Sequence, residues 1–166
     1  MEEIVNKVAQ SGLITIDLEE MYPEGKRASF DIADQLWQGI ALREKDFREF
    51  IKTNDWEKYR GAFVAVHCSV DAILPHWAYM LVASRLEGIA DKVVQGNLEM
   101  LEQVLFSEMI SQLDVEPYRD RRLVIKGCSK RHVPVSAYVD LVNKLQPVAK
   151  SILFGEPCST VPVFKR

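Results

Sequence analysis

Short apolar runs rich in β-branched residues alternate with helical segments, and this alternation constrains the fold more than any other feature of the sequence. Residues 62–67 form an apolar run without polar alternation, as expected for a strand covered on both faces. Residues 92–95, 122–126 and 151–154 are the next strand candidates. The segments between them are long enough for helices, so right-handed crossovers and parallel strand pairing are expected.

The helical segments show apolar residues at helical spacing. In residues 43–52 these are Phe47, Phe50 and Ile51. Further helices are predicted to start at Pro75, after a cap at Asn97, and at Ser136.

The N-terminal part has a different pattern. Residues 2–11 predict a short helix, and residues 13–18, 28–32 and 36–42 predict three strands close together in sequence. The sequence therefore predicts one α/β domain over residues 1–166. It has a mostly parallel sheet with helices on both faces and a small N-terminal antiparallel section.

Composition and charge are those of an ordinary globular protein. The chain has 166 residues, of which 48% are hydrophobic and 27% charged, enough for one core without a partner. Its net charge of −3 gives no general attraction to phosphate backbones, and the basic run at residues 119–122 is typical of a solvated face. We therefore expect no nucleic-acid partner.

The beginning of the chain is acidic and lacks the features of a secretory signal, and no apolar run reaches the length of a membrane span. These features predict a cytoplasmic protein without membrane association. In that compartment thiols stay reduced, and the three cysteines cannot form a closed set of intrachain disulfides.

Cys68, Cys128 and Cys158 each come shortly after a predicted strand, and each is followed by serine. The carboxyl ends of parallel strands meet at one edge of a sheet, where ligands bind in open α/β folds. We therefore expect the three thiols to lie near one another.

A metal site is one interpretation of these cysteines. Three thiolates and a fourth ligand suit zinc, and thiolates also hold iron–sulfur clusters. The fourth ligand would be Asp71 or His132, which stand three and four residues after Cys68 and Cys128. No C-x-x-C pair supports this interpretation.

Two other interpretations stay open. Cys128 or Cys158 could act as a nucleophile or sulfur carrier, because a loop before a helix favours the thiolate. Alternatively, the cysteines are small apolar residues without chemistry, in a protein that docks a partner. A cysteine phosphatase loop beginning at His67 is excluded, because the position that needs arginine is Leu74.

The remaining candidate side chains have ordinary structural explanations. His67 ends a buried strand and is expected to be a satisfied core histidine, and His76 lies in the first turn of a helix. Trp77, Tyr79 and Tyr138 are expected in the core or in the wall of a pocket.

Five stretches carry a resemblance to a known family: IVNKVAQSGLITIDLE, LREKDFREF, CSVDAILPHWAYM, KGCSKRHVPVSAYV and LQPVAKSILFGEPCSTVP. They resemble a bacterial family known as domain of unknown function 2480, and the resemblance covers almost the whole chain. Members that look like this chain are often encoded beside iron–sulfur cluster assembly genes. The resemblance therefore implies an accessory role in that pathway, with assembly components as partners.

The family pattern is matched at Cys68, Asp71, Cys128 and Cys158 and at residues 155–162, whereas the histidines are outside it. The resemblance thus favours Asp71 over His132. The leading hypothesis is a zinc or iron–sulfur site formed by these four residues. The alternatives are a thiol-dependent sulfur acceptor or transferase, and an interaction protein with structural cysteines.

Overall fold

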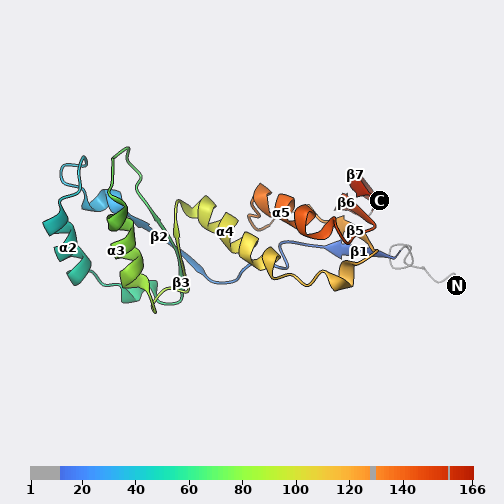
Figure 1. Cartoon of the computed structure of the whole chain (residues 1–166), viewed down its shortest axis with the longest axis horizontal. Coiled ribbons are helices and arrows are strands. Elements are labelled where there is room, and N and C mark those ends of the chain that lie inside the picture. The colour runs from blue at the N-terminus through green and yellow to red at the C-terminus, as the bar shows by residue number, and fades with distance from the viewer. Residues whose placement is uncertain (1–11, 128–129, 157) are drawn as a thin grey trace. The chain divides into compact units, whose positions relative to one another are not determined.

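The computed structural model describes residues 12–127, 130–156 and 158–166 (Figure 1). The chain divides into two compact units. The central unit is Glu24–Val104, and the terminal unit is Met1–Pro23 with Leu105–Arg166. Each unit has its own hydrophobic core.

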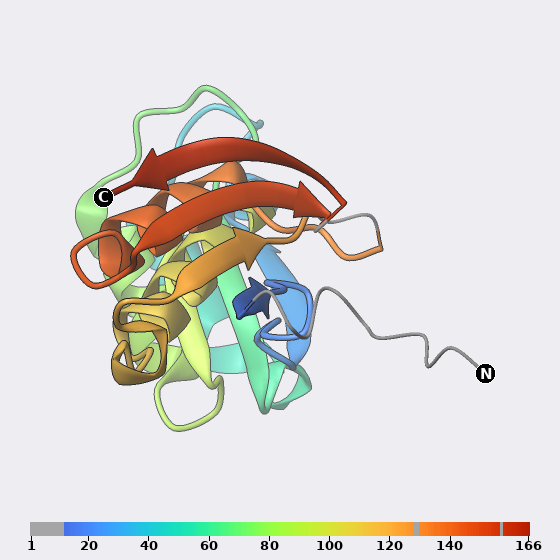
Figure 2. The same cartoon turned by 90° about the vertical axis from the view of Figure 1, so that its right-hand side faces the viewer.

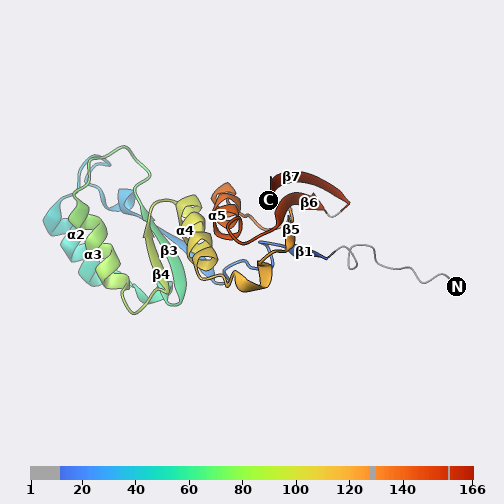
Figure 3. The same cartoon turned by 45° about the vertical axis from the view of Figure 1, so that its right-hand side comes forward.

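The central unit contains a parallel three-stranded sheet in the order β2-β3-β4. Helices α2 and α3 lie side by side in this unit (Figure 3). The elements are β2 (Lys26–Asp31), η1 (Ile32–Gln35), α2 (Glu44–Thr53), η2 (Glu57–Tyr59), β3 (Ala62–His67), α3 (His76–Leu86) and β4 (Lys92–Gln95).

Aromatic rings form much of the core of the central unit. Phe30 stacks on Trp56 with 5.5 Å between ring centroids and meets Tyr59 edge to face at 6.4 Å. The Trp56 indole Nε1 donates a hydrogen bond to the Ile51 carbonyl oxygen at 2.9 Å, so its polar group is satisfied although the residue is buried.

The terminal unit contains a four-stranded sheet in the order β1-β5-β6-β7, in which β7 alone runs antiparallel to its neighbour. Figure 2 shows β5, β6 and β7 side by side. The strands are β1 (Leu13–Ile16), β5 (Arg122–Ile125), β6 (Ser151–Glu156) and β7 (Ser159–Lys165).

Three further elements complete the description: α4 (Leu98–Ser111), η3 (Glu116–Tyr118) and α5 (Val135–Leu145). Helix α4 crosses the boundary between the units, and its second half contributes Phe106 and Ile110 to the core of the terminal unit. Helix α5 buries Ala137, Leu141 and Leu145, which are four residues apart and share one helix face.

The predicted α/β class with mostly parallel strand pairing is confirmed. The strands are divided between two sheets, however, and the predicted N-terminal antiparallel section is wrong, because β1 and β2 belong to different sheets. The antiparallel pair is β6 and β7. One domain over residues 1–166 stays a prediction, and the predicted helix at residues 2–11 lies outside the described residues.

Residues 36–42 do not form the predicted strand. Instead, Trp37 and Ala41 make an isolated bridge around a tight turn in which Gln38 and Gly39 have φ of 53° and 68°. No helix among the described residues is long and apolar enough to cross a membrane.

Candidate functional site

Two joined hollows lie at the carboxyl ends of β1, β5 and β6 in the terminal unit. These three strands are parallel, so their carboxyl ends lie at the same end of the sheet. This is where open α/β sheets bind ligands. The hollows share Gly127, Lys130 and Arg131, and we call the pair the carboxyl-end crevice.

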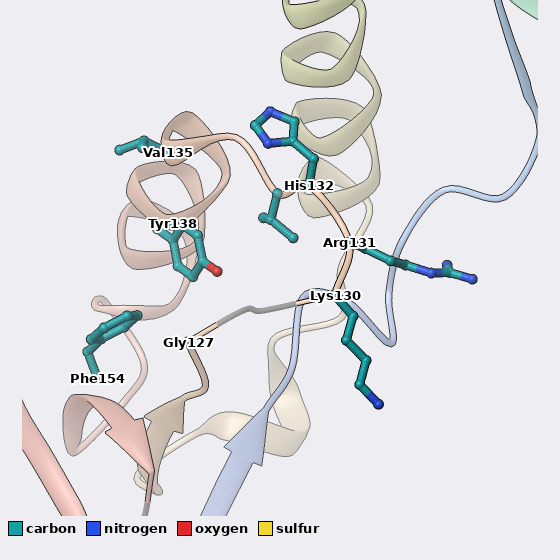
Figure 4. A pocket seen from close by; sticks show the side chains of 8 residues that line it. Gly127, Lys130, Arg131, His132, Val135, Tyr138 and Phe154 are labelled. Atoms are coloured by element: carbon teal, nitrogen blue, oxygen red, sulfur yellow. The ribbon is translucent and has the colours of Figure 1, made fainter.

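The larger hollow has a mostly apolar wall and a volume of about 720 Å³. The Tyr138 ring from α5 meets the Phe154 ring from β6 edge to face, with centroids 5.9 Å apart. Figure 4 shows these rings on one side of the hollow, whereas the side chains of Lys130 and Arg131 extend away from them. The lining residues are Gly127, Lys130, Arg131, His132, Val133, Val135, Tyr138 and Phe154.

The smaller hollow has a volume of about 440 Å³ and a wall of both charge signs. The Lys126 Nζ lies 3.9 Å from the Asp17 Oδ2, which is the limit of an ion pair. The lining residues are Asp17, Glu19, Glu20, Lys126, Gly127, Lys130, Arg131 and Glu156. Polar groups of a ligand could thus meet cationic and anionic partners at short range.

Glu19 fixes the loop that borders both hollows. Its Oε1 accepts hydrogen bonds from the backbone N–H groups of Lys130, at 2.6 Å, and Arg131, at 2.8 Å. The Arg131 guanidinium lies over the Tyr22 ring, 4.8 Å from its centroid. Both contacts hold this loop to the segment that follows β1.

Cys68 and Asp71 belong to the central unit. Cys68 follows β3 and is half-buried, and its thiol donates a weak hydrogen bond to the Val70 carbonyl oxygen at 3.4 Å. Asp71 is exposed in the segment that leads to α3.

Cys158 and His132 belong to the terminal unit, and both are exposed. Cys128 lies outside the described residues. The expectation that the cysteines leave one sheet is wrong for Cys68 and Cys158, because β3 and β6 belong to different sheets. Among the described residues, no three His, Cys, Asp or Glu side chains are grouped to hold a metal ion. The proposed ligand set, Cys68 and Asp71 with Cys128 and Cys158, stays a prediction.

A polar cluster lies at the carboxyl ends of β2 and β3 in the central unit. The Ser29 Oγ and the His67 Nε2 share a hydrogen bond of 3.0 Å. Burial tends to raise the pKa of Asp31. Hydrogen bonds from Ser69 and from the Ala33 N–H, together with the charge of His67, outweigh this and lower that pKa below its ordinary value. A hydroxyl beside a basic ring and a carboxylate is an arrangement found at nucleophilic sites and also at ordinary surface hydrogen bonds.

A third hollow of about 470 Å³ lies at the same end of this sheet, lined by Ala72, Leu74, His76, Tyr79 and Gln95. Burial raises the pKa of the Tyr79 phenol, and the neighbouring Cys68 and Asp31 raise it further. Tyr79 and Tyr138 are both pocket-wall residues, which was one of the two expectations for them.

The sequence analysis did not single out Ser29 or Glu19. Ser29 and Asp31 alternate with the buried Phe30 along β2, and this pattern marks a polar strand face. Nothing near Glu19 in the sequence indicates its role, because the backbone groups that it binds are 111 and 112 residues away.

The comparisons with known proteins give one match. A family model described as protein of unknown function, DUF2480, matches residues 2–166. No curated protein and no solved structure matches the chain.

Proposed function

The chain belongs to the DUF2480 family of unknown function, and we propose that it is a ligand-binding protein that holds a small organic molecule in the carboxyl-end crevice. One observation carries this proposal: a mostly apolar hollow of about 720 Å³ opens beside a charged one at the carboxyl ends of three parallel strands. Ligand pockets of that size, mostly apolar with a few polar groups, are typical of small-molecule sites.

The walls indicate the class of ligand. The rings of Tyr138 and Phe154 and the side chains of Val133 and Val135 offer an apolar surface that suits a planar or hydrocarbon body. The loose pair of Lys126 and Asp17 can bind a polar group of the ligand without first breaking a close contact. A ligand with an apolar ring system and a charged end fits both hollows.

The test is a titration of the full chain with the aromatic sulfonate 1-anilinonaphthalene-8-sulfonate, followed by fluorescence and by amide NMR shifts. We expect saturable binding, with shifts at Gly127, Val133 and Val135. The variant Phe154→Ala should bind at least tenfold more weakly, because it loses an aromatic wall.

Val163→Ala is the matched control, because Val163 is 50% exposed, close to the 40% of Phe154, and is not among the crevice residues. Equal affinity of the two variants, or shifts that avoid the crevice, would refute the proposal.

Thiol chemistry is a second candidate for the same end of the sheet. Cys158 is exposed two residues after the crevice residue Glu156, and Cys128 follows the crevice residue Gly127 in sequence. This placement supports a thiolate that attacks the sulfane sulfur of a persulfide in the crevice, so that the donor's S–S bond breaks, a cysteine persulfide forms and the donor leaves as a thiolate. A titration of thiol reactivity against pH tests it, because a carrier thiol reacts below the pH at which a free cysteine ionises, near 8.5. Three thiols that ionise near 8.5 would exclude it.

The metal hypothesis has a separate test. Purified full-length chain is analysed for zinc and iron, alongside Cys68→Ser, Asp71→Asn, Cys128→Ser and Cys158→Ser. A shared site requires stoichiometric metal that every substitution reduces, with a loss of several kcal/mol of stability for structural zinc. Absence of metal, with unchanged stability of all four variants, would refute it and with it an accessory role in iron–sulfur cluster assembly that rests on a bound metal.

A further inference from the structure

The sheet of the terminal unit has two chemically different faces. Ile14, Leu123 and Ile152 are register partners, and all three pack into the core. Successive side chains of a strand point to opposite faces. The neighbouring row of register partners, Leu13, Arg122, Ser151 and Lys165, therefore lies on the other face.

A hollow of about 440 Å³ lies on this other face, at the amino ends of β1, β5 and β6. Its apolar lining comes from Leu13, Leu153, Pro162 and Phe164. Among the described residues, the charged side chains of its lining are all basic: Arg122, Lys150, Lys165 and Arg166. We call it the amino-end groove, and it lies at the opposite end of the strands from the carboxyl-end crevice.

Among the residues that the structure describes, three of the four cations have no carboxylate partner. The Arg166 guanidinium donates to the Asp120 Oδ1 at 3.0 Å and to the Pro147 carbonyl oxygen at 3.1 Å. Within the described part of the chain, no ion pair joins Arg122, Lys150 or Lys165 to an acidic side chain.

The cations also come from the same end of the sheet. Arg122 and Lys165 flank Ser151 in one row across the sheet, which places their backbones about 10 Å apart. The Arg166 N–H donates to the Lys150 carbonyl oxygen at 3.0 Å, which brings Lys150 to the same end of the sheet. Like charges at this spacing repel one another, and a bound anion would relieve that repulsion.

We infer that the amino-end groove binds a free amphiphile with a hydrocarbon chain and one anionic head such as a carboxylate. The body lies on Leu13, Leu153 and Pro162, and the head meets Arg122, Lys150 and Lys165. A neutral or cationic amphiphile of the same length lacks the contacts between an anionic head and the three cations. The chain as a whole has a net charge of −3 and does not attract anions. The preference for an anionic head therefore comes from the cations of the groove.

The experiment uses three probes with the same ten-carbon chain: decanoate, decanol and decyltrimethylammonium. Decanoate and decyltrimethylammonium are titrated into the full chain below their micelle concentrations and decanol below its solubility limit, with amide NMR shifts as the measurement. We expect decanoate to shift the amides of Leu13, Arg122 and Leu153 and to bind at least tenfold more tightly than the other two. Its affinity should fall as salt concentration rises, because the groove is open to solvent.

Charge reversal tests the residues themselves. The double variant Lys150→Glu/Lys165→Glu should lower decanoate affinity at least tenfold. The double variant Lys45→Glu/Lys52→Glu makes the same change in net charge at exposed positions of α2 and should leave the affinity unchanged. All four positions are exposed, so both proteins should fold.

Three results would overturn the inference. The first is equal affinity for the three probes, and the second is an equal loss of affinity in the two double variants. The third is association with phosphatidylglycerol vesicles without any binding of free decanoate. These results leave the carboxyl-end crevice untouched, because the amides that report on it, Gly127, Val133 and Val135, line a different hollow.

Discussion

Glu102 of α4 and Arg27 of β2 form a bidentate ion pair that is largely withdrawn from water. The Arg27 Nε donates to the Glu102 Oε1 at 2.7 Å, and the Arg27 Nη2 donates to the Oε2 at 3.2 Å. Glu102 is only 8% exposed. The Arg27 guanidinium also donates to the Gly25 carbonyl oxygen and lies 5.3 Å from the centroid of the Phe63 ring.

Removing one partner of this pair leaves the other charge buried and uncompensated. Glu102→Ala should therefore lower the free energy of unfolding by about 3 to 5 kcal/mol. The measurement is urea denaturation followed by circular dichroism. The exposed pair of Glu57 and Arg60 supplies the control, since water screens this pair and Glu57→Ala should cost much less stability than Glu102→Ala. Equal losses in the two variants would contradict the argument.

Asp31 caps the short helix η1 by accepting a hydrogen bond from the Ala33 N–H, and it also accepts one from the Ser69 N–H. Asp31→Ala should cost about 1 kcal/mol of stability at pH 7. The pKa of Asp31 is lowered in the folded state, so its carboxylate stabilises the fold fully above the ordinary value of 3.8. That contribution is lost as pH falls through the lower folded pKa.

The difference in unfolding free energy between the native chain and Asp31→Ala should thus narrow at pH values below 3.8. The exposed Asp34, in the first turn of η1, serves for comparison as Asp34→Ala. If the difference in unfolding free energy between the native chain and Asp31→Ala stays constant from pH 7 to pH 3, the charge of Asp31 contributes nothing to stability.

Glu19 binds two consecutive backbone N–H groups, and its substitution should loosen the loop at Lys130 and Arg131. Charge-assisted hydrogen bonds contribute about 1.5 kcal/mol each, which corresponds to roughly tenfold faster amide exchange when one is lost. Hydrogen exchange of these two amides in Glu19→Ala is the measurement. Glu20→Ala, at the exposed neighbouring position, should leave both rates unchanged.

Gly155 has φ of +119°, and a Cβ atom there would lie 2.6 Å from the Ser159 carbonyl oxygen. Gly155→Ala should therefore destabilise the pairing of β6 and β7, by on the order of 2 to 3 kcal/mol. At Gly39 φ is also positive, at 68°, but no atom lies within 4 Å of a Cβ, so Gly39→Ala should cost only about 1 kcal/mol. Thermal unfolding of both variants provides the test.

Elements with a strong local signal were predicted well. The run at residues 62–67 coincides with β3, and Asn97 caps α4 through a hydrogen bond from the Met100 N–H to its Oδ1 at 2.9 Å. The sequence analysis does not predict strand β7, since its last strand candidate ends at residue 154. Instead, β6 continues through Gly155 to Glu156, and both residues pair with β7.

The division into two sheets could not be predicted, because periodicity identifies strands without fixing which strands pair. The same limit explains why the expectation that the cysteines leave one sheet is wrong for Cys68 and Cys158. Cys68 and Cys158 do follow parallel strands, as the sequence indicated, but those strands have different neighbours. The position of the carboxyl-end crevice could be predicted, because ligands bind at the carboxyl ends of parallel strands. Its lining could not, because it depends on contacts between residues that are distant in sequence.

The aromatic core of the central unit has an optical consequence. All three tryptophans of the chain, Trp37, Trp56 and Trp77, belong to Glu24–Val104, and the terminal unit has none. Trp56 is buried and hydrogen-bonded, whereas Trp37 is 41% exposed with the Arg43 guanidinium 4.0 Å from its ring centroid. Tryptophan emission therefore reports the melting of one half of the chain. The far-ultraviolet circular dichroism signal reports on the backbone of the whole chain. Comparing the unfolding curves from these two signals would show whether the central unit and the terminal unit unfold together or one after the other.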